Sequence, residues 1–392
     1  MKILPLLLLS SFIFTNITAS KANNFKADGV VSLGYIAPTS NHFLGEKAGE
    51  NAIFTESAIK ISYSFKNRFA VSSQVMLREI VGYTEPGARI DYLQLDYRNS
   101  MWQNSQQTYT LGRFKTQQGF YNNTRDIPFS RPSILLPQSV YFESLRNFSL
   151  SLDGIKINSV HSFDDSDLTL EIGGGKNTID SDFNRTIFGE TATGNWQSKN
   201  NYYTDVKWEN QNISLGINYF KVALDYTPNV GSYIPIEINN MIIPYPLIEG
   251  TYRSEALIYS GQYRLPNWEF TFEHSNFTFD SIGFYFSTVK RESKIKGTYF
   301  QSRYFLNNAL TLLVRYDVMK DRSDIKSTRK SLTQTKDLTL GLTWAFHKKW
   351  QLALEYHFLE GILWVPPVTK TTTVTDLDNR WGIAAIQLSY KF

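Results

Sequence analysis

One segment of the chain is dense in charged side chains, and these have the clearest capacity for chemistry. Five are basic and two are acidic: Arg113, Lys115, Arg125, Asp126, Arg131, Glu143 and Arg146. Fixed positive charges in a confined space would attract anions, or would polarise a mixed field across a passage. The same groups could instead pair with one another, Arg125 with Asp126 and Arg146 with Glu143, and simply hold the segment in shape. The sequence favours neither interpretation.

Groups suited to hydrolysis or metal binding are sparse. The five histidines are scattered and form no His-Glu-x-x-His motif: His42, His161, His274, His347 and His357. The chain has no cysteine, which removes disulfides, thiolate metal sites and a cysteine nucleophile. A formal net charge of +4 gives no electrostatic case for nucleic-acid binding. We therefore expect no enzyme, metal or cofactor.

The elements that must position these charges are β-strands. Reading back from the C-terminus, Phe392, Tyr390 and Leu388 alternate with Lys391 and Ser389, and a period of two indicates a strand with one apolar face. The alternation recurs in segments of about 10 residues, the length that a tilted strand needs to cross a bilayer. On the polar faces lie charged residues that we expect to line a pore wall: Lys207, Glu269, Glu273, Arg303, Arg315, Asp317 and Glu355.

Sixteen segments fit this pattern, an even number, as closure of an all-antiparallel sheet requires. They lie near residues 27–35, 54–64, 68–77, 88–98, 107–114, 149–158, 168–176, 200–208, 211–222, 252–264, 267–277, 294–306, 309–320, 336–347, 350–360 and 380–392. Tight turns and long polar loops alternate between them, as in barrels with short periplasmic turns and long extracellular loops. The sequence thus predicts an all-β transmembrane antiparallel β-barrel of about sixteen strands, a size that leaves an aqueous channel.

The N-terminus has the layout of a secretory signal peptide. Lys2 precedes an apolar stretch that is too short to span a bilayer, and small residues follow it. We expect cleavage of residues 1–22, after Ala22, with Ala19 as the alternative cut. Residues 23–392 show no linker and no change of composition, so we expect one barrel.

Two local motifs resemble the sixteen-stranded porins of Gram-negative outer membranes. Leu388, Tyr390 and Phe392 resemble the assembly signal at the end of outer-membrane proteins. Gly112 and Arg113 end the fifth strand and precede the longest loop, residues 115–148, as in porins, whose third loop folds into the barrel and narrows it. By this resemblance Arg113 would be a constriction residue. Strict alternation puts Arg113 on the face of Leu111, so that role requires a bulge in the strand.

The resemblance implies an outer-membrane porin that forms a water-filled channel for ions and small hydrophilic solutes, with a mild anion preference. It also implies a homotrimer, contact with outer-membrane lipid and lipopolysaccharide, and insertion by the barrel assembly machinery. An outer-membrane barrel enzyme, a protease or a phospholipase, is one alternative, although it would need a nucleophile or an acid paired with histidine. A binding or adhesion barrel with large outer loops is another. The sequence does not indicate which solute passes.

Overall fold

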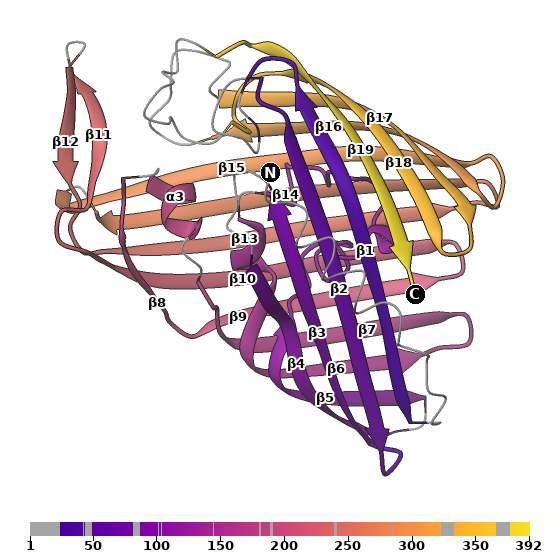
Figure 1. The fold of residues 1–392 in the computed structure, drawn as a ribbon. Helices are drawn as coiled ribbons and strands as arrows, with labels where there is room; N and C mark the ends of the chain where they lie inside the picture. Colours follow the sequence, from indigo (N-terminus) through magenta and orange to yellow (C-terminus); the bar gives the residue numbers. More distant parts are fainter. Residues whose placement is uncertain are drawn as a thin grey trace.

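The structure is a computed structural model, and its strands form one closed barrel (Figure 1). It describes residues 24–41, 43, 49–80, 87–100, 102, 104–143, 145–179, 182–188, 191–238, 241–284, 286–322, 333–365 and 377–392. The signal peptide and its cleavage site lie outside these ranges and stay predictions.

The barrel strands follow one another around the wall in chain order. They are β1 (Phe25–Pro38), β2 (Ala52–Phe65), β3 (Phe69–Ile80), β4 (Gly87–Asn99), β5 (Ser105–Lys115), β6 (Ser151–Ser162), β7 (Ser166–Lys176), β8 (Gly194–Ser198), β9 (Asn201–Asn210), β10 (Ile213–Pro228), β13 (Gly250–Arg264), β14 (Trp268–Gly283), β15 (Phe286–Phe305), β16 (Leu310–Asp321), β17 (Gln334–His347), β18 (Trp350–Glu360) and β19 (Arg380–Lys391). Both β8 and β9 pair with β10, one along each half of it, so together they fill one position of a sixteen-strand barrel. The predicted fold class is confirmed.

Short turns lie at one end of the barrel, and most of the connections at the other end are longer. The connections between strands contain elements that the alternation did not predict. They are the hairpin β11 (Tyr233–Ile238) and β12 (Met241–Pro246), which projects beyond the wall (Figure 1), the short helix α3 (Asp182–Phe188), and the short helices η1 (Pro128–Ser130) and α2 (Arg146–Ser149) in the connection between β5 and β6. They interrupt long connections, where no lipid-facing pattern constrains the sequence.

The barrel reverses the usual distribution of polar and apolar side chains. On β17 and β18 the outward Leu340 and Leu354 are 45% and 40% exposed, whereas the inward Thr339 and His357 are fully buried.

In lipid every backbone N–H and C=O group must form its hydrogen bond within the protein, and a closed sheet achieves this. No helix among the described residues is long and apolar enough to cross a membrane. This closed sheet with an apolar outer face is the architecture of an outer-membrane β-barrel.

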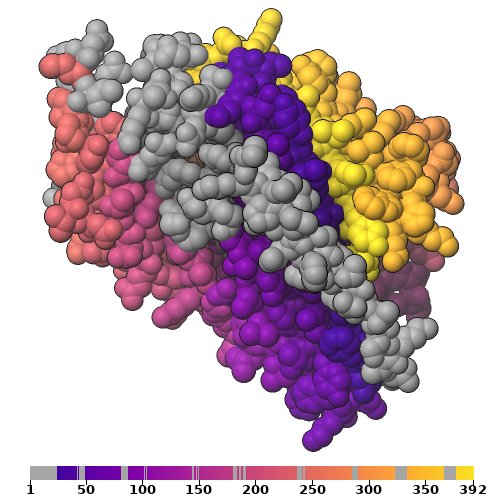
Figure 2. All heavy atoms as spheres, viewed as in Figure 1, coloured from indigo at the N-terminus to yellow at the C-terminus, as the bar shows by residue number. Residues whose placement is uncertain are grey.

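The first and last strands of the barrel, β1 and β19, meet where the barrel closes. Strand β1 pairs with β19 from Val30 opposite Lys391 to Pro38 opposite Ile383, and Figure 2 shows the indigo and yellow surfaces side by side. Phe392 continues the seam, because its backbone N–H donates to Gly29 O (3.0 Å) and its carbonyl accepts from Gly29 N (3.2 Å). The Phe392 ring fills the space where a Cβ on Gly29 would lie, 2.2 Å from its Cζ.

A charge on the lipid face should destabilise the barrel far more than the same charge inside it. We expect Leu340→Arg to cost about 2–4 kcal/mol, because an Arg at the bilayer midplane loses its hydration. Thr311→Arg, on the inward face of β16, is the matched control and should cost much less. A denaturant titration of folding into liposomes measures both, and equal costs would contradict the assignment of faces.

Removal of Phe392 should block assembly without blocking secretion. The deletion removes two backbone hydrogen bonds and the ring that covers Gly29 at the seam. Outer-membrane fractions should then contain little heat-modifiable barrel, and the chain should accumulate in the periplasm. Phe392→Tyr preserves an aromatic ring and should assemble. Normal levels of folded barrel after the deletion would show that this residue is dispensable.

Candidate functional site

The connection between β5 and β6 folds into the barrel. Its apolar residues are covered rather than solvated: Ile134, Leu135 and Leu136 are each at most 5% exposed. On one side of this loop, aromatic rings of α3, β10, β13 and β14 fill the interior together with Tyr121, Tyr141 and Phe148 of the loop itself. The apolar residues that distinguish this segment are thus explained by contact with the inner wall. We call residues 116–150 the inner loop.

A buried carboxylate on β14 fixes the first part of the inner loop. Glu273 accepts hydrogen bonds from Phe120 N (2.9 Å) and from the hydroxyl of Tyr141 (2.6 Å). The wall adds two more donors to the same carboxylate, the hydroxyls of Tyr299 and Ser260, each at 2.6 Å. All four donors are directed at one carboxylate that has no access to water, and two of them, Phe120 N and the Tyr141 hydroxyl, belong to the inner loop and hold it against β14.

Three charged wall residues hold the second part. Glu355 accepts from the backbone N–H groups of Ile134 and Leu135, the latter at 3.2 Å. Arg315 donates to Leu135 O at 3.0 Å, and Asp317 accepts from the N–H of Ser139 at 3.3 Å.

A glycine permits this close docking on β15. A Cβ on Gly297 would lie 2.1 Å from the carbonyl oxygen of Ser139. That same oxygen accepts from Ser275 Oγ at 2.6 Å. The loop backbone therefore lies directly against the wall, and a side chain at Gly297 would push it away.

Several predicted pore-wall residues are therefore covered. Glu273, Arg315, Asp317 and Glu355 lie on the inner wall, as the alternation indicated, but the inner loop buries each of them to 7% exposure or less. The prediction that they line an open passage is wrong, because their hydrogen bonds are used to hold the loop. Glu269 pairs with Arg303 at 3.0 Å, also on the inward face.

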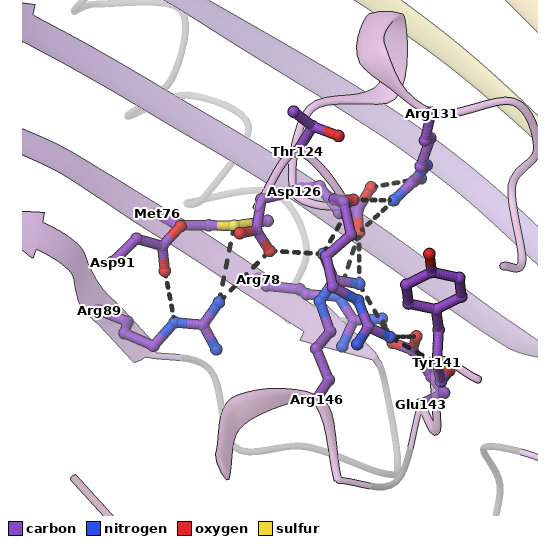
Figure 3. Close-up of polar contacts among 12 residues, drawn as sticks. Met76, Arg78, Arg89, Asp91, Thr124, Asp126, Arg131, Tyr141, Glu143 and Arg146 are labelled. Atoms are coloured by element: carbon purple, nitrogen blue, oxygen red, sulfur yellow. Dashed lines mark hydrogen bonds and ion pairs between the residues drawn. The ribbon is translucent and has the colours of Figure 1, made fainter. Parts of the chain in front are cut away.

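A cluster of opposite charges connects the other side of the inner loop to β2–β5 (Figure 3). We call it the ionic cluster; its members are Glu56, Arg78, Arg89, Asp91, Lys115, Arg125, Asp126, Arg131, Glu143 and Arg146. Arg146 contacts three carboxylates, those of Asp126 (2.7 Å), Glu143 (3.1 Å) and Glu56 (3.3 Å). Six cations face four carboxylates, so the cluster is mostly neutralised and retains a positive surplus.

The sequence offered the alternative that the charged residues of the loop pair with one another, and the ion pairs in the structure match only part of it. Arg146 does pair with Glu143, as that alternative expected. Arg125 instead donates to Glu143 at 3.0 Å, and Asp126 pairs with Lys115 at 2.5 Å. The sequence missed the wall members Glu56, Arg78, Arg89 and Asp91. The sequence could have indicated Glu56, because it is a charged residue on the inward face of the strand predicted near residues 54–64.

Arg113 does not belong to this cluster. The strand β5 keeps its register with both neighbours, so no bulge turns the side chain inward. Arg113 lies on the outer face with Leu111 and pairs there with Asp153 at 2.7 Å, while the next residue, Phe114, is fully buried inside. The prediction that Arg113 is a constriction residue is wrong, because the alternation of the strand determines its face.

The opposite inner wall is more accessible. Near the short-turn end, Lys207 and Glu209 of β9 pair at 2.8 Å with side chains 32% and 34% exposed. Further up, Lys156 of β6 and Glu171 of β7 pair at 3.5 Å and are 17% and 13% exposed. Charged side chains that retain water contact on an inward face indicate space beside them.

A buried network of one histidine and two carboxylates was not predicted from the sequence. His357 of β18 lies 2.9 Å from Asp337 Oδ2 through Nδ1 and 3.4 Å from Glu355 Oε2 through Nε2, and all three side chains are at most 3% exposed. Glu355 and His357 lie on the same strand, whereas Asp337 is 20 residues from His357 in the sequence and meets it only across the paired strands. Among the described residues, no group of three or more His, Asp or Glu side chains has the arrangement of a metal site.

Solved outer-membrane barrels share this architecture at low sequence identity. OmpT, an outer membrane protein of Vibrio cholerae, aligns with a TM-score of 0.59 at 10% identity, over 96% of this chain and 100% of that one. The anion-selective porin from Comamonas acidovorans gives 0.56 at 10% identity, over 94% and 99%. Salmonella typhi OmpF, in complex with daunomycin, gives 0.55 at 12% identity, over 94% and 98%.

The fold is that of the sixteen-stranded porins. No protein-family model and no curated protein matches the sequence, so the likeness is one of fold.

The pKa values of the acidic loop residues reflect the ionic cluster. Burial by itself would raise the pKa of the Glu143 carboxyl, but the three guanidinium groups around it outweigh burial and hold the pKa well below its usual range. Burial would also raise the pKa of the Asp126 carboxyl. The ammonium group of Lys115 and two guanidinium groups outweigh burial and hold this pKa well below its usual value. Burial lowers the pKa of Arg125 to about 10, which leaves it charged at neutral pH.

Acid should therefore loosen the inner loop. Since the docked loop lowers the pKa of Glu143 and Asp126, docking gains stability above the ordinary carboxyl pKa, about 4, and loses it progressively as the pH falls below that value. Amide protection in residues 118–143, corrected for intrinsic exchange, should be constant from about pH 8 to 5 and fall below about pH 4.

Glu143→Gln provides the control for this effect. The variant should show weaker protection at pH 7 and a smaller loss on acidification, because one of the titrating groups is gone. Protection that is equal at about pH 7 and pH 3 in the wild type would mean that the ion pairs do not hold the loop.

Proposed function

We propose that this protein is a porin, a water-filled channel for passive diffusion of ions and small hydrophilic solutes. The observation that carries the proposal is the position of the inner loop: it is fastened along the wall of β13–β19 and narrows the barrel from that side. The opposite wall, β6–β9, retains accessible charged side chains such as Lys156 and Lys207. The passage follows this opposite wall.

We propose a mild preference for anions. The ionic cluster has more cations than carboxylates, and its surplus lies in a confined space where screening by salt is weak. Arg78 and Arg89 retain 14% and 26% exposure, so the surplus is not fully enclosed by protein. The effect comes from the cluster as a whole, because Arg125, Arg131 and Arg146 are buried and paired.

The geometry supports a porin over a barrel enzyme. The one buried arrangement of histidine and acid described above, His357 with Asp337, lies beneath the inner loop with no exposed surface on either side chain. A substrate would have to displace the loop to reach it. A hydrolase needs its nucleophile and base to be open to the substrate.

Single-channel recording in planar bilayers tests the proposal. We expect stable conductance steps, and a reversal potential in a KCl gradient that indicates weak anion selectivity. Lys156→Gln combined with Lys207→Gln should move the reversal potential toward cations, because two positive charges leave the proposed passage. The shift should shrink at 1 M salt, where the Debye length is about 3 Å.

Two controls separate charge from folding and area. Lys221→Gln removes a lysine from the outer face, where it pairs with Glu255, and should leave selectivity unchanged. Deletion of residues 131–139 should raise conductance, since it removes part of the constricting loop. A correctly folded barrel that conducts no ions would overturn the porin function and favour a binding barrel.

A further inference from the structure

Two aspartates face each other on the inner wall beneath the inner loop. In the register of β16 and β17, Asp317 lies directly opposite Asp337, and both side chains are fully buried. Residues that are directly opposite have Cβ atoms about 4.5–5.5 Å apart, and like charges in such pairs are destabilising. Two ionised carboxylates would therefore repel each other here unless a positive group lies between them.

Each of these carboxylates has one oxygen that the protein satisfies and one that it does not. Asp317 Oδ2 accepts from the backbone N–H of Ser139 at 3.3 Å. Asp337 Oδ2 accepts from Thr339 Oγ1 at 2.7 Å and lies 2.9 Å from His357 Nδ1. Both Oδ1 atoms are buried and form no hydrogen bond with any residue that the structure describes. A buried acceptor without a partner costs free energy, so these two oxygens indicate a bound group.

A third oxygen without a partner comes from the inner loop. Ser139 is fully buried, and its Oγ also forms no hydrogen bond within the described part of the chain. Since the backbone N–H of the same residue donates to Asp317, this hydroxyl lies close to the aspartate pair. Two carboxylate oxygens from the wall and one hydroxyl from the loop are hard oxygen donors, the type that calcium and magnesium prefer.

The guanidinium of Arg315 does not neutralise Asp317, although both side chains point inward from the same strand. It donates to Ser133 Oγ at 2.9 Å, to Leu135 O at 3.0 Å and to Thr339 Oγ1 at 3.2 Å. Asp317 itself forms no ion pair with any described residue. An ionised carboxylate in such a position is costly to bury.

Asp337 shares its ion partner with a second carboxylate. The imidazole of His357 lies between Asp337 and Glu355, so one proton on that ring would serve two acidic groups. A water molecule could satisfy the free oxygens of the aspartate pair, but it would leave the charge of Asp317 uncompensated. A cation satisfies the oxygens and the charge together.

We propose that Asp317, Asp337 and Ser139 bind a calcium ion. Its protein ligands are the two Oδ1 atoms and Ser139 Oγ, and water completes a shell of about six to eight oxygens. Calcium fits better than magnesium, because calcium accepts irregular geometry whereas magnesium demands a near-ideal octahedron. The site takes two carboxylates and a hydroxyl, so it differs from the arrangements of three or more acidic or histidine side chains that the described residues lack. The ion would fasten the inner loop to the wall at Ser139.

Calcium titration of the purified barrel tests this site. The barrel is refolded in dodecyl maltoside, dialysed against EDTA and then transferred to EDTA-free buffer. Isothermal titration calorimetry with calcium chloride should show one bound ion per chain, and magnesium chloride should bind more weakly. Asp317→Asn and Asp337→Asn should each weaken calcium binding at least about tenfold, because each removes one charged ligand. Ser139→Ala should weaken it by a smaller factor, because the ligand that it removes is neutral.

Glu269→Gln is the matched control. Glu269 is another inward carboxylate of this wall, but it already pairs with Arg303 at 3.0 Å. This variant should bind calcium like the wild type.

Heat denaturation separates binding from folding. In EDTA the double variant Asp317→Asn with Asp337→Asn should resist unfolding at least as well as the wild type, because the repulsion is gone. Added calcium should raise the unfolding temperature of the wild type and of Glu269→Gln but not that of the double variant.

Three outcomes would overturn the proposal. A folded wild-type barrel that binds no calcium, and whose unfolding temperature depends on pH but not on EDTA, would indicate that the two aspartates share a proton. Equal calcium binding by the wild type and both Asn variants would place the ion elsewhere. An equal loss in Glu269→Gln would reduce the effect to the general negative charge of the wall. None of these measurements depends on conduction, so they are independent of the proposed porin function.

Discussion

The hydrogen-bonded closure of the sheet is the constraint on which the rest of the structure depends. A bilayer offers no partners for free backbone N–H and C=O groups, so the strands must satisfy one another around a complete circle. Sixteen strands set a diameter too large to be filled by wall side chains alone. The interior then needs either water or additional chain, and the inner loop supplies the additional chain on one side.

The inner loop shows how a barrel can contain many charged side chains that are paired with one another and do not line an open constriction. Removing one partner from a buried, hydrogen-bonded ion pair costs about 3–5 kcal/mol, because the other charge remains uncompensated. The ionic cluster and the carboxylates of Glu273 and Glu355 therefore fix the loop by geometry. Wall charges that the alternation of the strands assigned to the pore wall, such as Glu273 and Glu355, instead hold the inner loop in place.

Much of this could be predicted from the sequence, for a clear physical reason. Lipid on one face and polar protein on the other impose a strict period of two, so all sixteen predicted segments correspond to strands. The same alternation placed Arg113 outside, and the family motif that placed it inside was misleading. Contacts such as Arg131 with Glu56, or His357 with Asp337, were beyond reach. They join residues that become neighbours only once the strand order and the path of the loop are known.

One contact of the inner loop bears on how the barrel could open. Arg131 donates to Glu56 Oε2 of β2 at 2.8 Å and to Gln387 Oε1 of β19 at 2.9 Å, and Gln387 in turn donates to Ser32 Oγ of β1. A single guanidinium thus connects the strands on both sides of the seam where the first and last strands meet. The seam is closed twice, once by its backbone ladder and once from within. Strand separation at this point would have to extract a segment that lies hundreds of residues away from the C-terminus, which couples lateral opening of the wall to the state of the lumen.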